Sequence, residues 1–202
     1  MKLIVLGSSG QLGKSFKKSI DSNLFEVQYF SRHELDICQH KEIEKNIRLI
    51  KPDFVIIAAA KVGGILANRE KKAEFIYENI MIQTNLIHAS YLTKVKKLIF
   101  LGSSCIYPKY CKQPILEKYL LSGKLEETND AYAIAKISGI KLCQSYREQY
   151  KFNSICLMPT NLYGYGDNFD LESSHVIPAL IRKFLEAKEN NSNVVCWGSG
   201  KP

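Results

Sequence analysis

The sequence predicts an α/β fold, in the form of a Rossmann-like, doubly wound parallel sheet with helices on both faces. The chain opens with a short run at 2–6 that is apolar from Leu3 to Leu6, and a glycine-rich turn at 7–13 follows it at once. Similar short apolar runs recur between longer helical stretches. Unbroken apolar runs are typical of strands buried on both faces of a parallel sheet, and their alternation with helices indicates βαβ units.

Composition restricts the broad class of protein. The 202 residues are 46% hydrophobic and 24% charged, which is ordinary for a globular protein of one domain, or of one domain and part of a second. No apolar run is long enough to cross a bilayer, and the first residues lead into a strand instead of a secretory signal. We therefore expect a cytoplasmic protein without a membrane partner.

The charge pattern and the cysteine spacing argue against two further classes of protein, nucleic-acid-binding proteins and metal-binding proteins. The net charge of +8 arises from lysines scattered in twos and threes, a pattern typical of solvated helix faces and not of a nucleic-acid-binding segment. The six cysteines show neither C-x-x-C pairs nor metal-finger spacing. We expect free thiols, no metal site and no nucleic-acid partner.

The glycine-rich turn predicts a dinucleotide-binding loop. Gly7, Gly10 and Gly13 lie between the strand at 2–6 and a helical stretch that ends near residue 20. Such glycines allow a tight turn, a close approach of a pyrophosphate to backbone amides, and close packing of the helix on the strand. The spacing differs from the G-x-G-x-x-G form, so a structural turn without a ligand is the alternative.

The second predicted strand, at 25–30, bears on the choice of cofactor. Arg32 follows this strand. A basic residue at this place fits a 2′-phosphate, whereas an acidic residue would accept a hydrogen bond from a free ribose hydroxyl. We therefore predict NADP(H) as the cofactor. Asp36 lies either near the adenine or at the N-cap of the next helix.

The remaining elements follow in the order that the fold requires. Helical periodicity and apolar runs predict helices at 41–50, 68–92 and 131–150, and strands at 54–60, 98–101 and 152–158. Ser173 and Ser174 can cap a helix over 175–187, and residues 193–197 resemble a sixth strand. A loop of some two dozen residues precedes the helix at 131–150, and its length suggests a functional role.

Side chains with useful chemistry gather around the helix at 131–150. Tyr132 and Lys136 are four residues apart and so lie on one helix face, while Ser103 ends the fourth strand, at the edge where such sheets bind ligands. Lys136 supplies a positive charge that favours the phenolate, and Ser103 can hydrogen-bond the substrate oxygen that Tyr132 protonates. Ser104 is the rival for that role. With a dinucleotide bound, this indicates hydride transfer to or from a carbonyl.

Several segments together carry a resemblance to a known family. They are Gly7-x-x-Gly10-x-x-Gly13, Ala58-Ala-Ala-Lys-Val-Gly-Gly64, Gly102-Ser-Ser-Cys-Ile-Tyr-Pro-Lys109, Tyr132-Ala-Ile-Ala-Lys136, Met158-Pro-Thr-Asn-Leu-Tyr-Gly164 and Ser174-His-Val-Ile-Pro-Ala-Leu180. With these segments the chain resembles the extended short-chain dehydrogenase/reductases that act on nucleotide sugars, and within them the GDP-L-fucose synthases. The resemblance covers essentially the whole chain.

The resemblance implies a two-part reaction on GDP-4-keto-6-deoxy-D-mannose, epimerisation at C3 and C5 followed by NADPH reduction at C4. It implies that Cys105 is the base and His175 the acid of the epimerisation, and that Asn161 and Lys183 bind the substrate. A polarised carbonyl acidifies both neighbouring C–H bonds, so a base and an acid on opposite faces can invert them. The alternative is that Cys105 is a small buried hydrophobe and His175 a surface residue at a helix start.

The resemblance also implies a domain organisation and partners. Family members continue with a smaller domain that holds the nucleotide sugar. We therefore expect residues 1–170 to form the NADP-binding domain and 171–202 to begin a truncated substrate-binding region, with most of that domain absent. Family dimers predict a homodimer through the helices at 68–92 and 131–150. Two other functions stay open: epimerisation or reduction at C4 of another nucleotide sugar, and NADP binding without catalysis.

Overall fold

The fold is built on a five-stranded, all-parallel sheet in the order β2-β1-β3-β4-β5. A computed structural model of the chain describes residues 1–196. The strands are β1 (Lys2–Leu6), β2 (Glu26–Phe30), β3 (Phe54–Ile57), β4 (Lys97–Leu101) and β5 (Ser154–Leu157). The strand order reverses between β1 and β3, which makes that point the topological switch of a doubly wound sheet.

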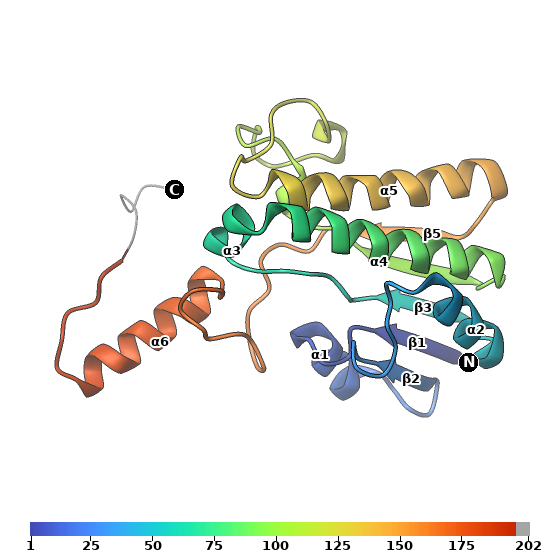
Figure 1. Cartoon of the computed structure of the whole chain (residues 1–202), viewed down its shortest axis with the longest axis horizontal. Coiled ribbons are helices and arrows are strands. Elements are labelled where there is room, and N and C mark those ends of the chain that lie inside the picture. Colours follow the sequence, from blue (N-terminus) through green and yellow to red (C-terminus); the bar gives the residue numbers. More distant parts are fainter. Residues whose placement is uncertain (197–202) are drawn as a thin grey trace.

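Helices cover both faces of this sheet, as predicted (Figure 1). The helices are α1 (Gln11–Ser19), α2 (His40–Ile50), α3 (Ile65–Glu70), α4 (Lys72–Leu92), α5 (Asp130–Tyr150) and α6 (Val176–Glu189), with 3-10 turns at Ser104–Ile106 and Glu117–Tyr119. The long helices α4 and α5 run side by side in one direction, and α6 lies beyond the carboxyl ends of the strands (Figure 1). The predicted α/β, doubly wound fold class is confirmed.

The larger core lies between the sheet and the helices α2, α4 and α5. It includes the sheet residues Ile57, Leu98 and Phe100, each at most 1% exposed. Helix α5 approaches β4 very closely at Gly139, where an added Cβ would lie 2.6 Å from the Phe100 ring and 2.7 Å from the side-chain oxygen of Gln83. The absence of a side chain at this position therefore sets the spacing of α5 from both β4 and α4.

A buried amide also joins the two long helices. Gln83 on α4 is 2% exposed, and its Nε2 donates hydrogen bonds to the carbonyl oxygen of Ala135 and, at 2.8 Å, to the Ser138 hydroxyl, both on α5. At the start of the helices, the Lys72 ammonium lies 2.8 Å from the Asp130 carboxylate. These contacts hold α5 beside α4, and the close packing at Gly139 holds α5 against the sheet.

The opposite face of the sheet has a smaller core. Leu3, Val5 and Ile56 pack there against Phe16 and Ile20 of the α1 region. Towards the β5 edge this face carries less cover, and Leu157 is 46% exposed. Most of the packing that positions α5 therefore comes from the α4 side.

Three sequence predictions about local structure are wrong. The helix predicted at 68–92 is divided at Lys71, whose backbone (φ −116°, ψ 34°) ends α3 and precedes α4. Residues 193–196 form no strand, because they follow α6 away from the sheet (Figure 1), and residue 197 lies outside the described residues. The N-cap of α6 is His175, not Ser173 or Ser174.

The alternative that Asp36 caps α2 is also wrong. The N-cap of that helix is Gln39. The Asp36 carboxylate instead accepts a hydrogen bond from the backbone N–H of Cys38 at 3.0 Å. This local turn occupies the carboxylate four residues before α2 begins at His40.

Candidate functional site

A cleft of about 530 Å³ lies at the carboxyl edge of the sheet. The segments that follow β1, β3, β4 and β5 all contribute to its walls, and the start of α5 and the start of α6 close it. This position, at the switch point and the carboxyl ends of parallel strands, is where α/β sheets bind ligands. The volume lies within the usual range for small-molecule sites.

The glycine-rich turn forms one end of this cleft. Gly7 has a φ of +92°, and an added Cβ at Gly13 would lie 2.4 Å from the Gly7 carbonyl oxygen, so both positions require glycine. Gly10 is the N-cap of α1 and lines the cleft together with Gln11. The open backbone and the amides of the first turn of α1 fit the pyrophosphate of a dinucleotide.

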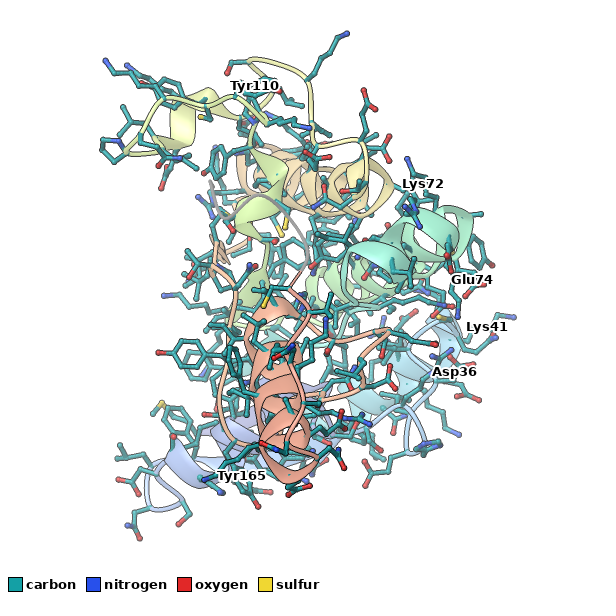
Figure 2. All side chains as sticks on the ribbon, turned by 90° about the vertical axis from the view of Figure 1, so that its left-hand side faces the viewer. Asp36, Lys41, Lys72, Glu74, Tyr110 and Tyr165 are labelled. Atoms are coloured by element: carbon teal, nitrogen blue, oxygen red, sulfur yellow. The ribbon has the colours of Figure 1, made fainter. Side chains whose placement is uncertain are left out.

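Arg32 lies outside this cleft, beside a second, open depression. Its side chain is 75% exposed, and its guanidinium lies 3.6 Å from the carboxylate of Glu78 on α4. Asp36 and Cys38 also line the second depression. Figure 2 shows Asp36 and Glu74 on the same side of the molecule, one from the segment before α2 and the other from α4. A ligand that reaches Arg32 must therefore extend from the glycine loop past the end of β2.

Lys136 is the most deeply buried charged group of the cleft. Its side chain comes from α5, is 3% exposed and donates a hydrogen bond of 2.8 Å to the carbonyl oxygen of Leu101 at the end of β4. Burial lowers the pKa of Lys136 to about 8, because removal from water disfavours the charged form. The ammonium form still predominates at neutral pH.

Tyr132 lies one helical turn before Lys136 and is packed edge-on against Phe75, with ring centroids 6.4 Å apart. Burial is the main cause that raises the pKa of Tyr132, the nearby Cys105 adds to the increase, and a hydrogen bond with Ser103 opposes it. The phenol is therefore a neutral hydroxyl at physiological pH, in a position to donate a proton.

Ser103 joins the tyrosine to the cysteine. Its hydroxyl donates to the Cys105 sulfur at 3.2 Å and accepts from the Cys105 backbone N–H at 3.3 Å. Ser103 lines the cleft, whereas its rival Ser104 is turned into the next 3-10 turn and does not line it. The geometry places Ser103, and not Ser104, beside Tyr132.

The structure places the other predicted site residues in two groups. His175, the N-cap of α6, and Asn161, in the segment after β5, both line the cleft. Lys183 lies farther along α6, does not line the cleft, and donates a hydrogen bond from Nζ to the Val195 carbonyl oxygen at 3.1 Å. Four predicted site residues thus do not line the main cleft: Lys183 and Arg32, which lie away from the glycine loop, and Gly7 and Gly13, which shape that loop without lining the cleft.

Sequence reasoning missed a set of polar residues that line the same cleft. Asn68 on α3 is 8% exposed, and its Nδ2 donates to the Gly63 and Gly64 carbonyl oxygens at 2.7 and 3.0 Å. Its Oδ1 has no hydrogen-bond partner among the described residues. The same holds for side-chain oxygens of Asn129, Asp167 and Ser174. Buried acceptors of this kind are costly unless a ligand satisfies them, and no sequence pattern assigned these side chains to ligand binding.

The structure also bears on the other predicted absences. Within residues 1–196, no group of three or more His, Cys, Asp or Glu side chains is arranged to hold a metal ion. The six cysteines are free thiols. None of the described helices is both long enough and apolar enough to cross a membrane.

Comparison with known proteins identifies the family of this fold and site. A family model described as the NAD dependent epimerase/dehydratase family matches residues 3–202. The chain belongs to this family. The segments that line the cleft, from the glycine loop to the start of α6, all lie within the matched region.

Relatives in the epimerase/dehydratase family share the whole of the chain. A GDP-L-fucose synthase from Sinorhizobium fredii is 54% identical over 202 residues, which is 100% of this chain and 64% of that protein. Among solved structures, a GDP-L-fucose synthetase from Naegleria fowleri bound to NADP is 30% identical with a TM-score of 0.87, covering 100% of this chain and 66% of that one. The chain therefore spans less than two thirds of the length of these relatives.

A second kind of relative is named for a different activity. A GDP-mannoheptose C4 reductase from Campylobacter jejuni, solved with NADP bound, is 40% identical with a TM-score of 0.85, covering 94% of this chain and 57% of that one. Both kinds of relative in the epimerase/dehydratase family are thus named for chemistry on GDP-linked sugars.

Proposed function

We propose that this chain carries the catalytic site of an NADPH-dependent enzyme that epimerises GDP-4-keto-6-deoxy-D-mannose at C3 and C5 and reduces it at C4 to GDP-L-fucose. The observation that supports this most strongly is the cluster of Ser103, Cys105, Tyr132 and Lys136 in one cleft with the glycine loop. The names of the relatives and the family supply the substrate class.

The residues present fit an NADP cofactor. The loop of Gly7, Gly10 and Gly13 would hold the pyrophosphate: Gly10 lines the cleft, Gly7 makes the tight turn, and Gly13 lets α1 pack close on the loop. Arg32 would pair with the 2′-phosphate, and Lys136 would approach the nicotinamide ribose from the buried side of the cleft. Bound NADPH supplies the hydride for the reduction at C4.

The reduction needs a proton as well as a hydride. Tyr132, held as a neutral phenol by burial, which raises its pKa, donates that proton to the C4 oxygen. Ser103 hydrogen-bonds the same oxygen, and the Lys136 ammonium lowers the free energy of the phenolate that remains. Each of these groups is fixed by a contact described above, so their orientation precedes substrate binding.

The epimerisation uses the other polar groups of the cleft. The C4 carbonyl, polarised by Ser103 and Tyr132, acidifies the C–H bonds at C3 and C5. Cys105 removes a proton from one face, and His175 returns one from the opposite face. The two residues come from different elements, the turn after β4 and the N-cap of α6, which supports an arrangement on two sides of the sugar. Asn161 and Lys183 bind the substrate.

A specific observation favours a second candidate, reduction at C4 of another GDP-linked sugar without epimerisation. A relative with 40% identity is named a GDP-mannoheptose C4 reductase. That chemistry needs Ser103, Tyr132 and Lys136 but not an acid and a base at C3 and C5. The two candidates therefore differ in the predicted role of Cys105 and His175.

The proposal extends to domains, location and assembly. Residues 1–170 form the NADP-binding domain, and 171–202 begin the substrate-binding region. The protein acts in the cytoplasm as a homodimer through α4 and α5, and the exposed Tyr77 and Ile134 (65% and 47%) supply apolar surface for that contact. A sedimentation profile with only monomer, at concentrations up to ~100 times those of the assay, would contradict the homodimer.

The experiment that tests the function separates binding from turnover. NADPH binding to the chain is first measured by fluorescence. GDP-4-keto-6-deoxy-D-mannose is then added in deuterated water, and NADPH oxidation and deuterium incorporation are followed together. Deuterium at C3 and C5 with oxidation supports the proposal, oxidation without deuterium favours the second candidate, and binding without either shows a cofactor-binding protein without catalysis.

A further inference from the structure

We propose that Glu78 limits the preference of this protein for a 2′-phosphate, because it holds Arg32 in an ion pair that the phosphate must displace. This inference rests on the proposed NADP cofactor and deepens it. It concerns the second depression, beside α4, and not the main cleft.

Glu78 lies between two basic groups. One carboxylate oxygen lies 3.6 Å from the Arg32 guanidinium, and the other lies 2.6 Å from the Lys61 ammonium. The Glu78 side chain is 19% exposed, whereas that of Arg32 is 75% exposed. The acid is therefore the fixed member of the pair with Arg32, and the arginine is the member that can move.

Hydrogen bonds between a buried amide and its backbone hold Lys61 in place. Asn79 on α4 is 2% exposed, accepts from the Lys61 backbone N–H at 3.0 Å and donates to the Lys61 carbonyl oxygen at 3.0 Å. The Lys61 ammonium pairs with both Glu78 and Glu74 on the same helix. A buried amide thus holds the partner of Glu78 in place.

This arrangement allows Arg32 to exchange partners. When Arg32 turns from Glu78 to a 2′-phosphate, Glu78 keeps its shorter contact with Lys61 and is not left unpaired. Arg32 can therefore turn to the phosphate, but two costs weaken phosphate binding. The Arg32–Glu78 ion pair is lost, and the Glu78 carboxylate remains near the incoming phosphate. Neither cost applies to a dinucleotide without the 2′-phosphate, so Glu78 acts on the choice between the two cofactors and not on dinucleotide binding in general.

The charges around the depression strengthen this effect. The residues that line it include the acids Asp36, Glu74 and Glu78 and a single basic residue, Arg32. Arg32 is thus the group that makes this surface acceptable to a phosphate, and its pairing with Glu78 determines how much of its charge is available.

The test uses two matched variants, Glu78→Gln and Glu74→Gln. Each removes one negative charge from α4 and one partner from Lys61, but only Glu78 contacts Arg32. Calorimetric dissociation constants are measured for the fragments 2′,5′-ADP and 5′-AMP, and for NADPH and NADH. Exposed ion pairs of this length change binding by about twofold to fivefold. Glu78→Gln is expected to tighten 2′,5′-ADP and NADPH by that factor and to leave 5′-AMP and NADH unchanged.

The controls decide between this inference and its alternatives. If Glu74→Gln tightens 2′,5′-ADP as much as Glu78→Gln does, general charge is responsible and the inference is overturned. In a background of Arg32→Ala, Glu78→Gln should give a smaller gain, since no pair remains to be broken; an equal gain also overturns it.

The failure of the proposed cofactor is distinguishable from the failure of this inference. A parent protein that binds neither NADPH nor 2′,5′-ADP overturns both. A parent that prefers NADPH, loses that preference with Arg32→Ala, and is unaffected by Glu78→Gln retains the proposed cofactor and overturns the role of Glu78 alone.

Discussion

The ammonium group of Lys136 lies 5.9 Å from the centroid of the Tyr132 ring and donates its hydrogen bond to the backbone of β4, at the Leu101 carbonyl oxygen. The positive charge is therefore located by the sheet and not by the tyrosine. A charge fixed in this way beside a buried phenol links the stability of the fold to the chemistry of the site, and the predictions below measure that link.

The first prediction concerns stability against pH. Burial lowers the pKa of Lys136 to about 8, below the value of about 10.4 in an unfolded chain. Between these two values the unfolded chain binds the additional proton, so the stability of the parent rises with pH across this window. Relative to Lys136→Met, the parent should gain ~2–3 kcal/mol in the free energy of unfolding from pH 7 to pH 10, measured by urea denaturation.

The comparison with Lys136→Met removes contributions common to both proteins. The methionine also leaves the Leu101 carbonyl oxygen without its donor, but that cost does not vary with pH. Parallel stability curves for the parent and the variant over pH 7–10 would show that the lysine is not desolvated in this way.

The second prediction concerns the proton donor. Tyr132→Phe keeps the ring that packs on Phe75 but removes the hydroxyl. We expect unchanged NADPH affinity and a loss of about 10²–10⁴-fold in the rate of NADPH oxidation, the range for one acid-base group. A variant that oxidises NADPH at the parental rate would exclude Tyr132 as the donor.

The third prediction compares two glycines of the same loop. An added Cβ at Gly13 would lie 2.4 Å from the Gly7 carbonyl oxygen, whereas one at Gly10 would lie 3.4 Å from that atom. Gly13→Ala should reduce the free energy of unfolding by ~1–3 kcal/mol, as other overpacked sites do. Gly10→Ala should cost less than ~1 kcal/mol and yet weaken NADPH binding, because Gly10 lines the cleft. Equal denaturation midpoints for the two variants would contradict this account.

The fourth prediction separates the acid from the base. Cys105→Ser removes the base and should abolish deuterium incorporation at C3 and C5. His175→Gln removes the acid and should abolish inversion at these carbons, although the base can still exchange a proton for deuterium on its own face. NADPH affinity stays at the parental value in both variants. Ser104→Ala, which alters a neighbour that does not line the cleft, serves as the control and should retain incorporation. Parental deuterium incorporation in Cys105→Ser, or parental inversion in His175→Gln, would assign that residue no part in epimerisation.

Much of the fold could be predicted because the signals were local. The apolar runs at β1 and β4, the glycine turn after β1 and the periodicity of α5 each identified an element within a few residues of its bounds. Helix α5 was predicted well since its inward face is almost entirely apolar or small. The division between α3 and α4 could not be predicted, because the polar residues around the break at Lys71, mostly Arg, Glu and Lys, are ordinary helix formers that give no signal for a helix end.

The site was predictable where it followed a motif. Ser103, Tyr132 and Lys136 were identified from spacing, and the structure places all three in one cleft. Asn68 and Ser174 were missed because an Asn in a helix and a Ser before one have many ordinary uses; their unpartnered oxygens are visible only when the chain is folded. Residues 193–196 were predicted as a strand from composition alone, which does not say whether a sheet edge is within reach.

The close approach at Gly139 has a consequence for how this protein can change. Lys136 lies one helical turn before Gly139 on the same helix, so any residue that lifts α5 from β4 there also lengthens the bond from the ammonium to Leu101. A hydrogen bond tolerates only a few tenths of an ångström of such movement. A methyl group at Gly139 would lie about 5 Å along the helix from the lysine and would touch no substrate. It would therefore lower the reaction rate before it unfolded the protein. The hydrogen atom that Gly139 carries in place of a side chain therefore sets the distance between the active-site helix α5 and the sheet.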